Sequence, residues 1–492
     1  MKILINIILL TLTILNAILF ADQNEKIIAR VLDTEITESE FYARSEYTPR
    51  PEYCNNDNII HKKIILNTLI AEKLLAHEAG SENELTKSPE YQVYIQGRKE
   101  QAMRQVHYYE EAYNNTVIDS AEIFKNYEIA GITYNISYFR IKDSSDSYSI
   151  YQQLLIDNIT FDSAYINYTL LDSVPTKEVS YFSQEIPAIS NTIFDGPKKK
   201  NEILEPILVD DSYILIRIDG WKNRLAITEE QKRSRMTDVE HKLLEASAWG
   251  KYHNQINELM KGKEVRFSQN TFQELVLLCA PYYLKDRKQK EALFNRSFWR
   301  AANENEVLVD HIANADFLRE SFLLNYNGDV WTVGKLLDEI KLHPLVFRKN
   351  ELSKIEFAEQ LKFAIVDLIR DKEITSDAYK KGYYKHNLVI KNVDMWSSNL
   401  LANYQKYKIF EKHQKEKKDT SEFLNEIMNP YIKKLQQKYS TEIKINVDEF
   451  AKIKLSDIDM LALQTDMAFP FIVPLFPKLT TLNKLDYGQV MK

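Results

Sequence analysis

The pattern of apolar and polar residues is most distinctive between residues 132 and 224. This stretch opens with a β-branched and aromatic run at 132–143 and closes with another at 205–224. Two helix-like segments and a turn-rich passage lie between these runs, which have the composition of strands. The order predicts a small α+β unit in which the first strand pairs with the last.

The N-terminal region has a helical pattern. A short strand and a turn precede a helix that starts at Thr37 or Glu38, because Thr37 followed by Glu40 has the spacing of a capping box. The next helix carries one apolar stripe and ends at Gly80. The stripe consists of Ile65, Leu66, Leu69, Ile70 and Leu74.

Two longer helices are predicted at about 90–113 and 228–260, and a short strand at 264–267 follows the second. Only 11 Gly and 13 Pro occur in the chain, whereas Lys, Glu, Leu and Ile are abundant. This composition favours helix, so most of the chain is predicted to be helical.

The second half of the chain repeats the order of the first half without the central unit. Residues 324–340 correspond to 29–45, residues 356–382 to 62–80, and residues 438–453 to 262–275. Three correspondences in the same order indicate two related helical modules, with the central unit inserted in the first.

Length and charge limit the classes of protein that fit. At 492 residues the chain exceeds one compact core, so two to four structural units are expected. Its 64 basic and 71 acidic residues give a formal charge of -7, so the surface has no electrostatic footprint for nucleic acid. The 29 Tyr and 22 Phe are interpreted as core packing, with grooves that grip apolar peptide segments as the alternative.

Cofactor chemistry is not predicted. Cys54 and Cys279 fall in different predicted units and are expected to be two separate thiols. The sequence has no CxxC, HExxH or clustered His/Cys spacing, and it has no GxxxxGK[ST] motif. We therefore expect no metal site, no cofactor and no ATP-driven step.

The N-terminus has the features of a targeting segment. One Lys precedes an apolar stretch from Ile3 to Phe20, and Ala21 stands before a polar segment. A cleaved signal peptide at 1–21 is the preferred interpretation, and an uncleaved anchor that keeps the protein near a membrane is the alternative. Both place the remaining chain in the periplasm or otherwise outside the cytoplasm.

Two parts of the sequence resemble known families. Val31–Thr37, with the later helix, resembles the opening of periplasmic chaperones of the SurA, PrsA and PpiD kind. The helix residues that match are Leu69, Ile70, Lys73, Leu74, Leu75, Glu78 and Ala79. The central unit resembles a parvulin-type (PpiC) peptidyl-prolyl isomerase domain, most clearly in its second half at 177–182, 185–194 and 205–218.

These resemblances imply a fold and a domain division. The fold class is α+β, with mostly helical chaperone modules and an inserted parvulin-like α/β domain that has a small antiparallel sheet flanked by helices. The expected segments are 1–21, a signal peptide; 22–130, an N-terminal helical chaperone segment; 131–224, the parvulin-like domain; 225–275, a helix and strand returning to the first module; 276–320, a connecting segment; 321–455, a second SurA-like helical module; and 456–492, an apolar proline-containing tail. The tail is interpreted as a strap over the second module or as a docking patch.

The parvulin resemblance also implies a site. The family places two histidines across the sheet, a Cys or Asp near them, and an apolar pocket for the proline ring. In this sequence the histidine positions fall on Tyr138 and Ile214, and the Cys/Asp position falls near Asp172. No histidine lies between 108 and 240, so no confident catalytic residue is assigned. The candidates for the proline-binding cleft are Val179, Phe182, Ile189 and Phe194.

These substitutions predict weak or absent isomerase activity. The principal hypothesis is a folding chaperone that holds unfolded or outer-membrane-destined polypeptides against apolar surface between the helical modules. The alternative is an active peptidyl-prolyl isomerase with altered active-site residues, in which Tyr138 or Asp172 supplies a hydrogen bond. A third hypothesis is a structural envelope protein that keeps the scaffold.

Overall fold

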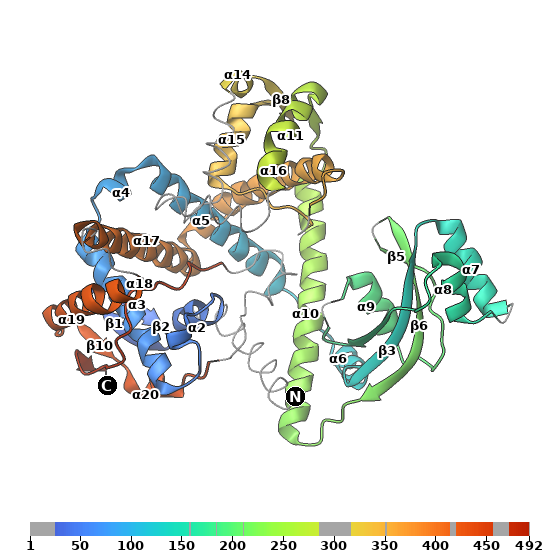
Figure 1. Cartoon of the computed structure of the whole chain (residues 1–492), viewed down its shortest axis with the longest axis horizontal. Coiled ribbons are helices and arrows are strands. Elements are labelled where there is room, and N and C mark those ends of the chain that lie inside the picture. Colours follow the sequence, from blue (N-terminus) through green and yellow to red (C-terminus); the bar gives the residue numbers. More distant parts are fainter. Residues whose placement is uncertain are drawn as a thin grey trace. The chain divides into compact units, whose positions relative to one another are not determined.

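The computed structural model describes residues 25–156, 159–183, 185–209, 211–284, 316–349, 352–413, 420–455 and 472–491. It has a mostly helical α+β fold with several small, mainly antiparallel sheets (Figure 1), which confirms the predicted fold class. The predicted signal peptide at 1–21 lies outside the described residues. So do residues 285–315 of the connecting segment and 456–471 of the tail.

The chain forms two compact units. The helical unit consists of Met1–Asn114 with Trp249–Lys492, and the inserted unit consists of Asn115–Ala248. In the part of the chain that the structure describes, no helix has the length and hydropathy needed to cross a membrane.

The helical unit begins with a hairpin and two helices. Strands β1 (Ile27–Val31) and β2 (Thr34–Thr37) pair antiparallel, and α2 (Glu38–Glu46) follows. The Thr37 hydroxyl accepts a hydrogen bond from the Glu40 amide at 3.2 Å, which confirms the predicted helix start. Helix α3 (Ile59–Ala79) ends at Gly80, as predicted, where φ is 73°.

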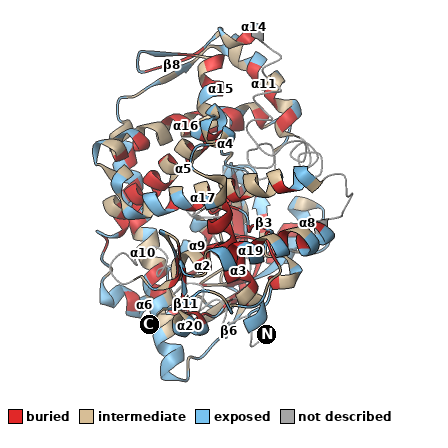
Figure 2. Ribbon diagram, turned by 90° about the vertical axis from the view of Figure 1, so that its left-hand side faces the viewer, coloured by how far each residue is buried: buried red, intermediate tan, exposed pale blue. Residues whose placement is uncertain are grey.

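The remaining elements before the insertion are η1 (Glu52–Cys54), α4 (Glu84–Lys87), α5 (Pro89–Tyr108) and the π-helical turn η2 (Tyr109–Tyr113). Helix α3 is buried over most of its length (Figure 2). Its apolar stripe packs against both strands of the hairpin and against the C-terminal helices.

A second hairpin repeats the first. Strands β8 (Phe322–Tyr326) and β9 (Asp329–Thr332) pair antiparallel, and α15 (Val333–Leu342) follows. The Thr332 hydroxyl caps α15 as Thr37 caps α2, and the turn residue Asn327 has a positive φ of 49°, where the first hairpin has Leu32 at 57°. The repeat predicted from the sequence is therefore present in the structure.

Each hairpin pairs with a strand from a distant part of the chain. Strand β10 (Ile443–Ile445) pairs antiparallel with β1, and β7 (Val265–Phe267) pairs antiparallel with β8. The expectation that the helix and strand of 225–275 return to the first module is therefore wrong for the strand. The two hairpins and the two strands have the same alternation of apolar and polar residues. Pairing of either strand with either hairpin would therefore satisfy that pattern.

Two hydrophobic clusters follow from this exchange. The first joins the N-terminal hairpin and α3 to C-terminal elements: α17 (Asn387–His413), η5 (Phe423–Met428), α19 (Asn429–Lys438) and α20 (Val447–Lys452). The second joins the β8–β9 hairpin to α11 (Gln269–Tyr283), α14 (Asp316–Arg319), α15 and α16 (Phe357–Lys380). The short elements η3 (Tyr383–Lys385) and α18 (Thr420–Glu422) connect helices of this unit.

The described part of the tail packs on the first cluster, which contains α17, η5, α19 and α20 of the expected second module as well as the N-terminal elements. Phe476 and Leu479 are buried in that cluster, and β11 (Gln489–Val490) runs parallel to β10. The two cysteines are buried free thiols, Cys54 in the first cluster and Cys279 in the second. Burial raises the pKa of both thiols to about 12.

One buried ion pair joins three helices and the tail. Arg44 of α2 donates to both carboxylate oxygens of Glu72 in α3 at 2.7 and 2.8 Å, and neither side chain is exposed. The amide of Asn399 in α17 donates to the same carboxylate at 2.7 Å, and Arg44 also reaches the carbonyl of Leu475 at 3.4 Å. Both carboxylate oxygens of Glu72 and both terminal nitrogens of Arg44 are hydrogen-bonded, which offsets much of the desolvation of the pair, while the Arg44 Nε has no partner among the described residues.

The inserted unit contains a four-stranded sheet in the order β4-β3-β6-β5. Its elements are α6 (Ser120–Ile129), β3 (Ile132–Ile141), α7 (Ser144–Ile156), α8 (Phe161–Thr169), β4 (Thr176–Ser180), α9 (Pro187–Ile193), β5 (Ile207–Val209) and β6 (Ser212–Asn223). Strands β3 and β6 pair antiparallel along their whole length, so the prediction that the first and last strands pair is confirmed.

Helix α10 (Glu229–Met260) belongs to both units, and its last turns return the chain to the helical unit. Within the helical unit, aromatic rings connect the end of α5, where the chain leaves this unit, to the part of α10 where the chain returns to it. Tyr108 of α5 lies 6.2 Å from Trp249 and 5.2 Å from Tyr252, between ring centroids. Tyr113 lies 6.2 Å from Tyr108, so the two crossing points share one aromatic cluster.

Close packing of α5 against α15 provides a stability test. A Cβ at Gly97 would collide with the carbonyl oxygen of Leu342, whereas a Cβ at Gly250, also inside a helix, meets nothing within 4 Å. We expect Gly97→Ala to lower the free energy of unfolding by about 1–3 kcal/mol through overpacking. Gly250→Ala should raise it by about 0.5–1 kcal/mol through helix propensity. Urea unfolding followed by circular dichroism measures both, and equal effects would contradict the packing described.

Candidate functional site

The candidate site residues of the inserted unit lie on one face of its sheet. Tyr138, Ile214 and the four cleft candidates belong to a single hydrophobic cluster with α9, here called the α9 face. In the β3–β6 ladder Tyr138 pairs with Ile216, so Ile214 is its diagonal neighbour on the same face. The structure thus brings six of the seven sequence candidates together.

Asp172 is the candidate that the structure does not bring to this face. It lies exposed in the bend after α8 and is not part of the α9-face cluster. The hydrogen-bonding side chain that remains among the six clustered candidates is the Tyr138 phenol, which is partly buried.

The α9 face is filled by its own side chains. Val179 is fully buried, and Ile189, Phe194 and Ile214 are at most 8% exposed. Tyr138 and Phe182 are partly buried at the edge of the cluster. A proline ring could reach the buried candidates only if packed side chains moved aside, which costs contacts in a close-packed core.

Helix α10 contributes to this packing, a feature that the family comparison of the sequence missed. Val239 is fully buried in the cluster, and Met236 and Leu243 pack beside it. Their spacing of three and four residues is the signal in the sequence that identifies a buried helical face.

A polar contact also joins α10 to this face. The Lys242 ammonium donates to the Tyr181 carbonyl and lies 4.2 Å from the centroid of the Tyr181 ring. Burial lowers the pKa of Lys242 to about 8. The Tyr181 hydroxyl donates to Asn126 at 3.1 Å, and burial raises its pKa to about 12. These groups position α10 and α6 against the sheet.

The opposite face of the sheet packs against α7 and α8. Phe139 and Leu215 are buried there with Phe161 of α8. At an irregularity in the β3–β6 ladder, Asp219 accepts hydrogen bonds from Ser137 at 2.6 Å and from Arg217 at 2.7 Å. This network fixes the strand where its twist changes.

The outer surface of α7, α8 and the turn that follows carries exposed apolar side chains, here called the α7–α8 surface. They are Tyr148, Leu155, Ile156, Ile166, Tyr168, Leu170 and Leu171. Leu170 is 85% exposed and Ile156 is 70% exposed, although both are large aliphatic residues. Exposed apolar residues gathered on neighbouring elements are typical of surfaces that bind other chains.

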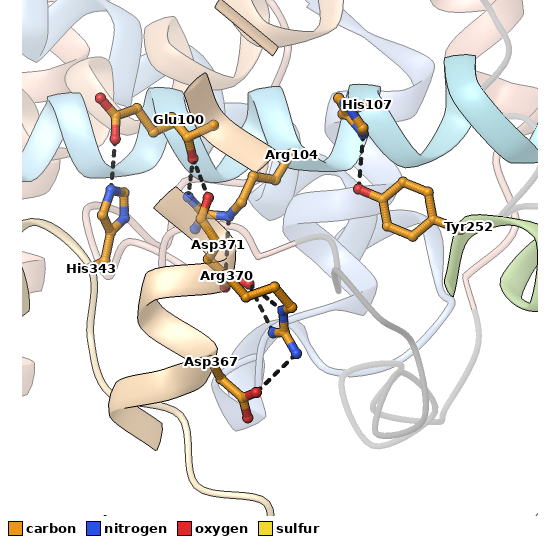
Figure 3. A network of polar contacts seen from close by, with 9 residues as sticks. Glu100, Arg104, His107, Tyr252, His343, Asp367, Arg370 and Asp371 are labelled. Atoms are coloured by element: carbon orange, nitrogen blue, oxygen red, sulfur yellow. Dashed lines mark hydrogen bonds and ion pairs between the residues drawn. The ribbon is translucent and has the colours of Figure 1, made fainter. Parts of the chain in front are cut away.

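In the helical unit, polar residues of α5 and α16 form a buried seam (Figure 3). Glu100 accepts a hydrogen bond from His343 at 2.6 Å, and Arg104 donates to Thr375 at 2.9 Å. Four residues separate Glu100 from Arg104, so both project from the same face of α5. The seam connects α5 of the first half to residues of the second half.

The seam continues through His107 to helix α10. The Nε2 atom of His107 lies 2.9 Å from a carboxylate oxygen of Asp377, and its Nδ1 atom lies 3.0 Å from the Tyr252 hydroxyl (Figure 3 shows the second contact). Lys381 forms ion pairs with Asp377 at 3.0 Å and with Glu111 at 2.8 Å. Three helices therefore meet at one histidine.

Burial determines the protonation of the seam. Burial lowers the pKa of His107 and of His343, and their hydrogen bonds to Asp377 and Glu100 offset only part of this effect. The pKa values of Glu100 and Asp377 are lowered: burial opposes their ionisation, but hydrogen bonds to His343 and to His107 with Lys381 outweigh it.

Comparisons with known proteins give similarity of structure only. No family model matches the chain, and no curated protein matches it. Among solved structures, the peptidylprolyl isomerase PrsA from Bacillus cereus is 15% identical, with a TM-score of 0.21, and the match covers 51% of this chain and 99% of that chain. The foldase protein PrsA from Streptococcus pneumoniae is 11% identical, with a TM-score of 0.18, covering 45% and 91%. The chain is thus similar, at low identity, to PrsA foldases over about half its length.

From the buried histidines of the seam we predict that the free energy of unfolding of the helical unit falls at acidic pH. Because the pKa of each buried histidine is lowered in the folded state, the unfolded chain binds more protons as the pH falls through about 6.5. Stability should therefore fall between about pH 7.5 and pH 5.5, before the carboxyl groups of the seam titrate. Urea unfolding at both pH values measures this loss.

His343→Gln is the variant that tests the cause. It removes one titrating group, so the loss of stability between the two pH values should become smaller. His253→Gln is the matched control, because His253 lies exposed on α10. An unchanged pH dependence in His343→Gln would show that this histidine is not the origin.

Proposed function

We propose that the protein is a folding chaperone outside the cytoplasm, in the periplasm or at the membrane, that holds unfolded or outer-membrane-destined polypeptides. The observation that carries the proposal is the exposed apolar α7–α8 surface on a unit whose opposite, family-type pocket is filled. Apolar side chains exposed to water favour association with other apolar segments without any requirement for a specific sequence.

The proposal assigns the inserted unit weak or no isomerase activity. Rotation about an X-Pro bond has a barrier of about 18–20 kcal/mol. Lowering this barrier requires a pocket that binds the proline ring and hydrogen bonds placed at the twisted amide. In this unit Val179 and Phe194 pack in a core, and the family's histidine positions hold Tyr138 and Ile214. The Tyr138 phenol is the group on which the alternative, an active isomerase, depends.

The chaperone proposal predicts a loss of holding activity when the α7–α8 surface is made polar. Leu155→Ser combined with Leu171→Ser should raise the concentration needed to suppress aggregation of an unfolded outer-membrane-type client by roughly threefold or more, since each leucine contributes about 1.5–3 kcal/mol when buried by a client. The control is Leu277→Ser with Val346→Ser, two positions of the helical unit that are 74% and 72% exposed, compared with 53% for Leu155 and 59% for Leu171. Equal activity of the double variant and the wild type would contradict the proposal.

The isomerase alternative is tested separately. We expect the purified protein to leave the rate of cis/trans exchange of a proline peptide within about twofold of the uncatalysed rate, a difference below 0.5 kcal/mol. Magnetisation-exchange spectroscopy measures this rate. A large acceleration that is lost in Tyr138→Phe, which keeps the ring and removes the hydroxyl, would establish the alternative instead.

A further inference from the structure

A cavity of about 270 Å³ lies in the helical unit, and the residues that line it have no role in the proposed function. It lies between the η1 turn, helix α17, the π-helix η5 and the C-terminal segment. Its wall is apolar where Pro51 and Phe423 contribute and polar where Tyr53, Lys406 and Lys478 contribute. The volume is slightly below the range of about 300–1,000 Å³ for sites that bind drug-sized molecules, so only a small ligand would fit.

The charge of this cavity is of one sign. Lys406 and Lys478 are the charged residues in its wall, and no carboxylate is among the described residues that line it. The Lys406 ammonium donates to the carbonyl oxygen of Lys478 at 2.7 Å, and within the described residues neither lysine forms an ion pair. Burial, together with the charge of Lys478, lowers the pKa of Lys406 to about 8. A partly buried ammonium that lacks a counter-ion is costly to the fold.

A second polar group in the wall lacks a partner. The hydroxyl of Tyr53 is buried, and in the described part of the chain it has no hydrogen-bond partner. Burial raises the pKa of this phenol to about 12, so the hydroxyl keeps its proton and can donate it in a hydrogen bond. A buried hydroxyl without a partner is unfavourable for the fold, and a hydrogen bond to a ligand oxygen would remove that cost.

The backbone around the cavity is unusual and held in place. Phe423, Leu424 and Asn425 line the cavity from the π-helix η5, and π-helical turns inside helices are frequent at functional sites. The side-chain oxygen of Asn425 accepts hydrogen bonds from Thr481 at 3.0 Å and from Asn429 at 3.2 Å. These contacts fix the π-helix to the C-terminal segment without using Lys406 or Tyr53.

A larger cavity of about 370 Å³ beside the N-terminal hairpin provides a contrast. It is lined by both signs of charge, and two of its lysines are paired with carboxylates within the fold. Lys73 forms an ion pair with Glu40 at 2.9 Å, and Lys391 forms one with Glu25. That cavity therefore has less need of a charged ligand than the cavity at Lys406.

We propose that the cavity at Lys406 binds an organic carboxylate that carries a small apolar body. The carboxylate accepts a hydrogen bond from the Lys406 ammonium and another from the Tyr53 hydroxyl, which is covered in the ligand-free protein and turns toward the cavity on binding. The apolar body lies against Phe423, Leu424 and Pro51. Charge-assisted hydrogen bonds of this kind are about twice as strong as neutral ones. A free carboxylic acid and the C-terminal residue of a polypeptide present the same chemistry.

Calorimetric titration of the full chain with 3-phenylpropionate tests the site. We expect saturable binding at neutral pH and no binding of the neutral analogue 3-phenylpropionamide. Affinity should fall above about pH 8, where Lys406 loses its proton. Absence of binding up to about 10 mM acid, which means a binding free energy weaker than about 3 kcal/mol, would overturn the proposal.

Three substitutions assign the contacts. Lys406→Met keeps the aliphatic stem and should weaken binding by about tenfold or more, and Tyr53→Phe by several-fold. Lys408→Met is the matched control, because Lys408 lies two residues further along α17 and pairs with Glu84 at the surface. Equal affinity of Lys406→Met and the wild type would contradict the assignment.

Tyr53→Phe has a second readout that does not depend on the ligand. Because the hydroxyl is unsatisfied in the described structure, its removal should leave the unfolding midpoint of the ligand-free protein unchanged or higher. A clearly lower midpoint would show that the hydroxyl already has a partner, and would contradict the proposal.

Peptides distinguish the two sources of the carboxylate. A short peptide ending in Phe with a free carboxylate is compared with the same peptide amidated at its C-terminus. Binding of the free form that depends on Lys406 supports a polypeptide C-terminus as the ligand. Binding of 3-phenylpropionate but of neither peptide supports a free acid, and in both cases the carboxylate site stands.

Discussion

The helical unit depends on one buried ion pair, Arg44 with Glu72. The pair has no exposure to solvent, so each charge is stabilised by the other and by the groups that hydrogen-bond to it. Asn399 and the Leu475 carbonyl complete the arrangement, and they come from parts of the chain more than 300 residues away. Charges buried in this way are tolerated only when all these parts are in place, so the pair makes formation of the first cluster cooperative.

This constraint explains why the two repeated modules are not independent. The N-terminal hairpin and α3 obtain their cover from α17, η5, α19 and β10, which follow the second hairpin in the sequence. The second hairpin obtains its third strand from β7, which precedes it. The exchange interleaves the halves of the chain, and the buried seam between α5 and α16 adds polar contacts where they meet.

Much of the local structure could be predicted from the sequence, because it depends on neighbouring residues. The cap at Thr37 and the helix end at Gly80 follow from short-range patterns, and the pairing of the distant strands β3 and β6 follows from the strand-like composition of the two runs that form them. The choice of partner for β7 could not be predicted, since two equivalent edges compete for it. The cluster on which the tail packs could not be predicted for a similar reason: its apolar residues suit either cluster, and only the folded chain shows which one is open.

The candidate site could also be predicted only in part. Alignment to the parvulin pattern collected Tyr138, Ile214 and the cleft candidates correctly onto one face, because strand alternation fixes the side of the sheet. It did not show that these residues are packed among themselves and against α10, because packing depends on distant segments. The cavity at Lys406 was also missed, since it is assembled from four separate segments and its signal is a set of unpaired groups, not a motif.

The aromatic cluster of Tyr108, Tyr113, Trp249 and Tyr252 has a topological consequence. Because the chain leaves and re-enters the helical unit at adjoining positions, the two ends could be spliced by a short loop at small entropic cost. The inserted unit can therefore be gained, replaced or lost in evolution as one block. A lineage could exchange or discard the inserted unit without rebuilding the scaffold that carries it, and substitutions within that unit would leave the scaffold's own folding intact.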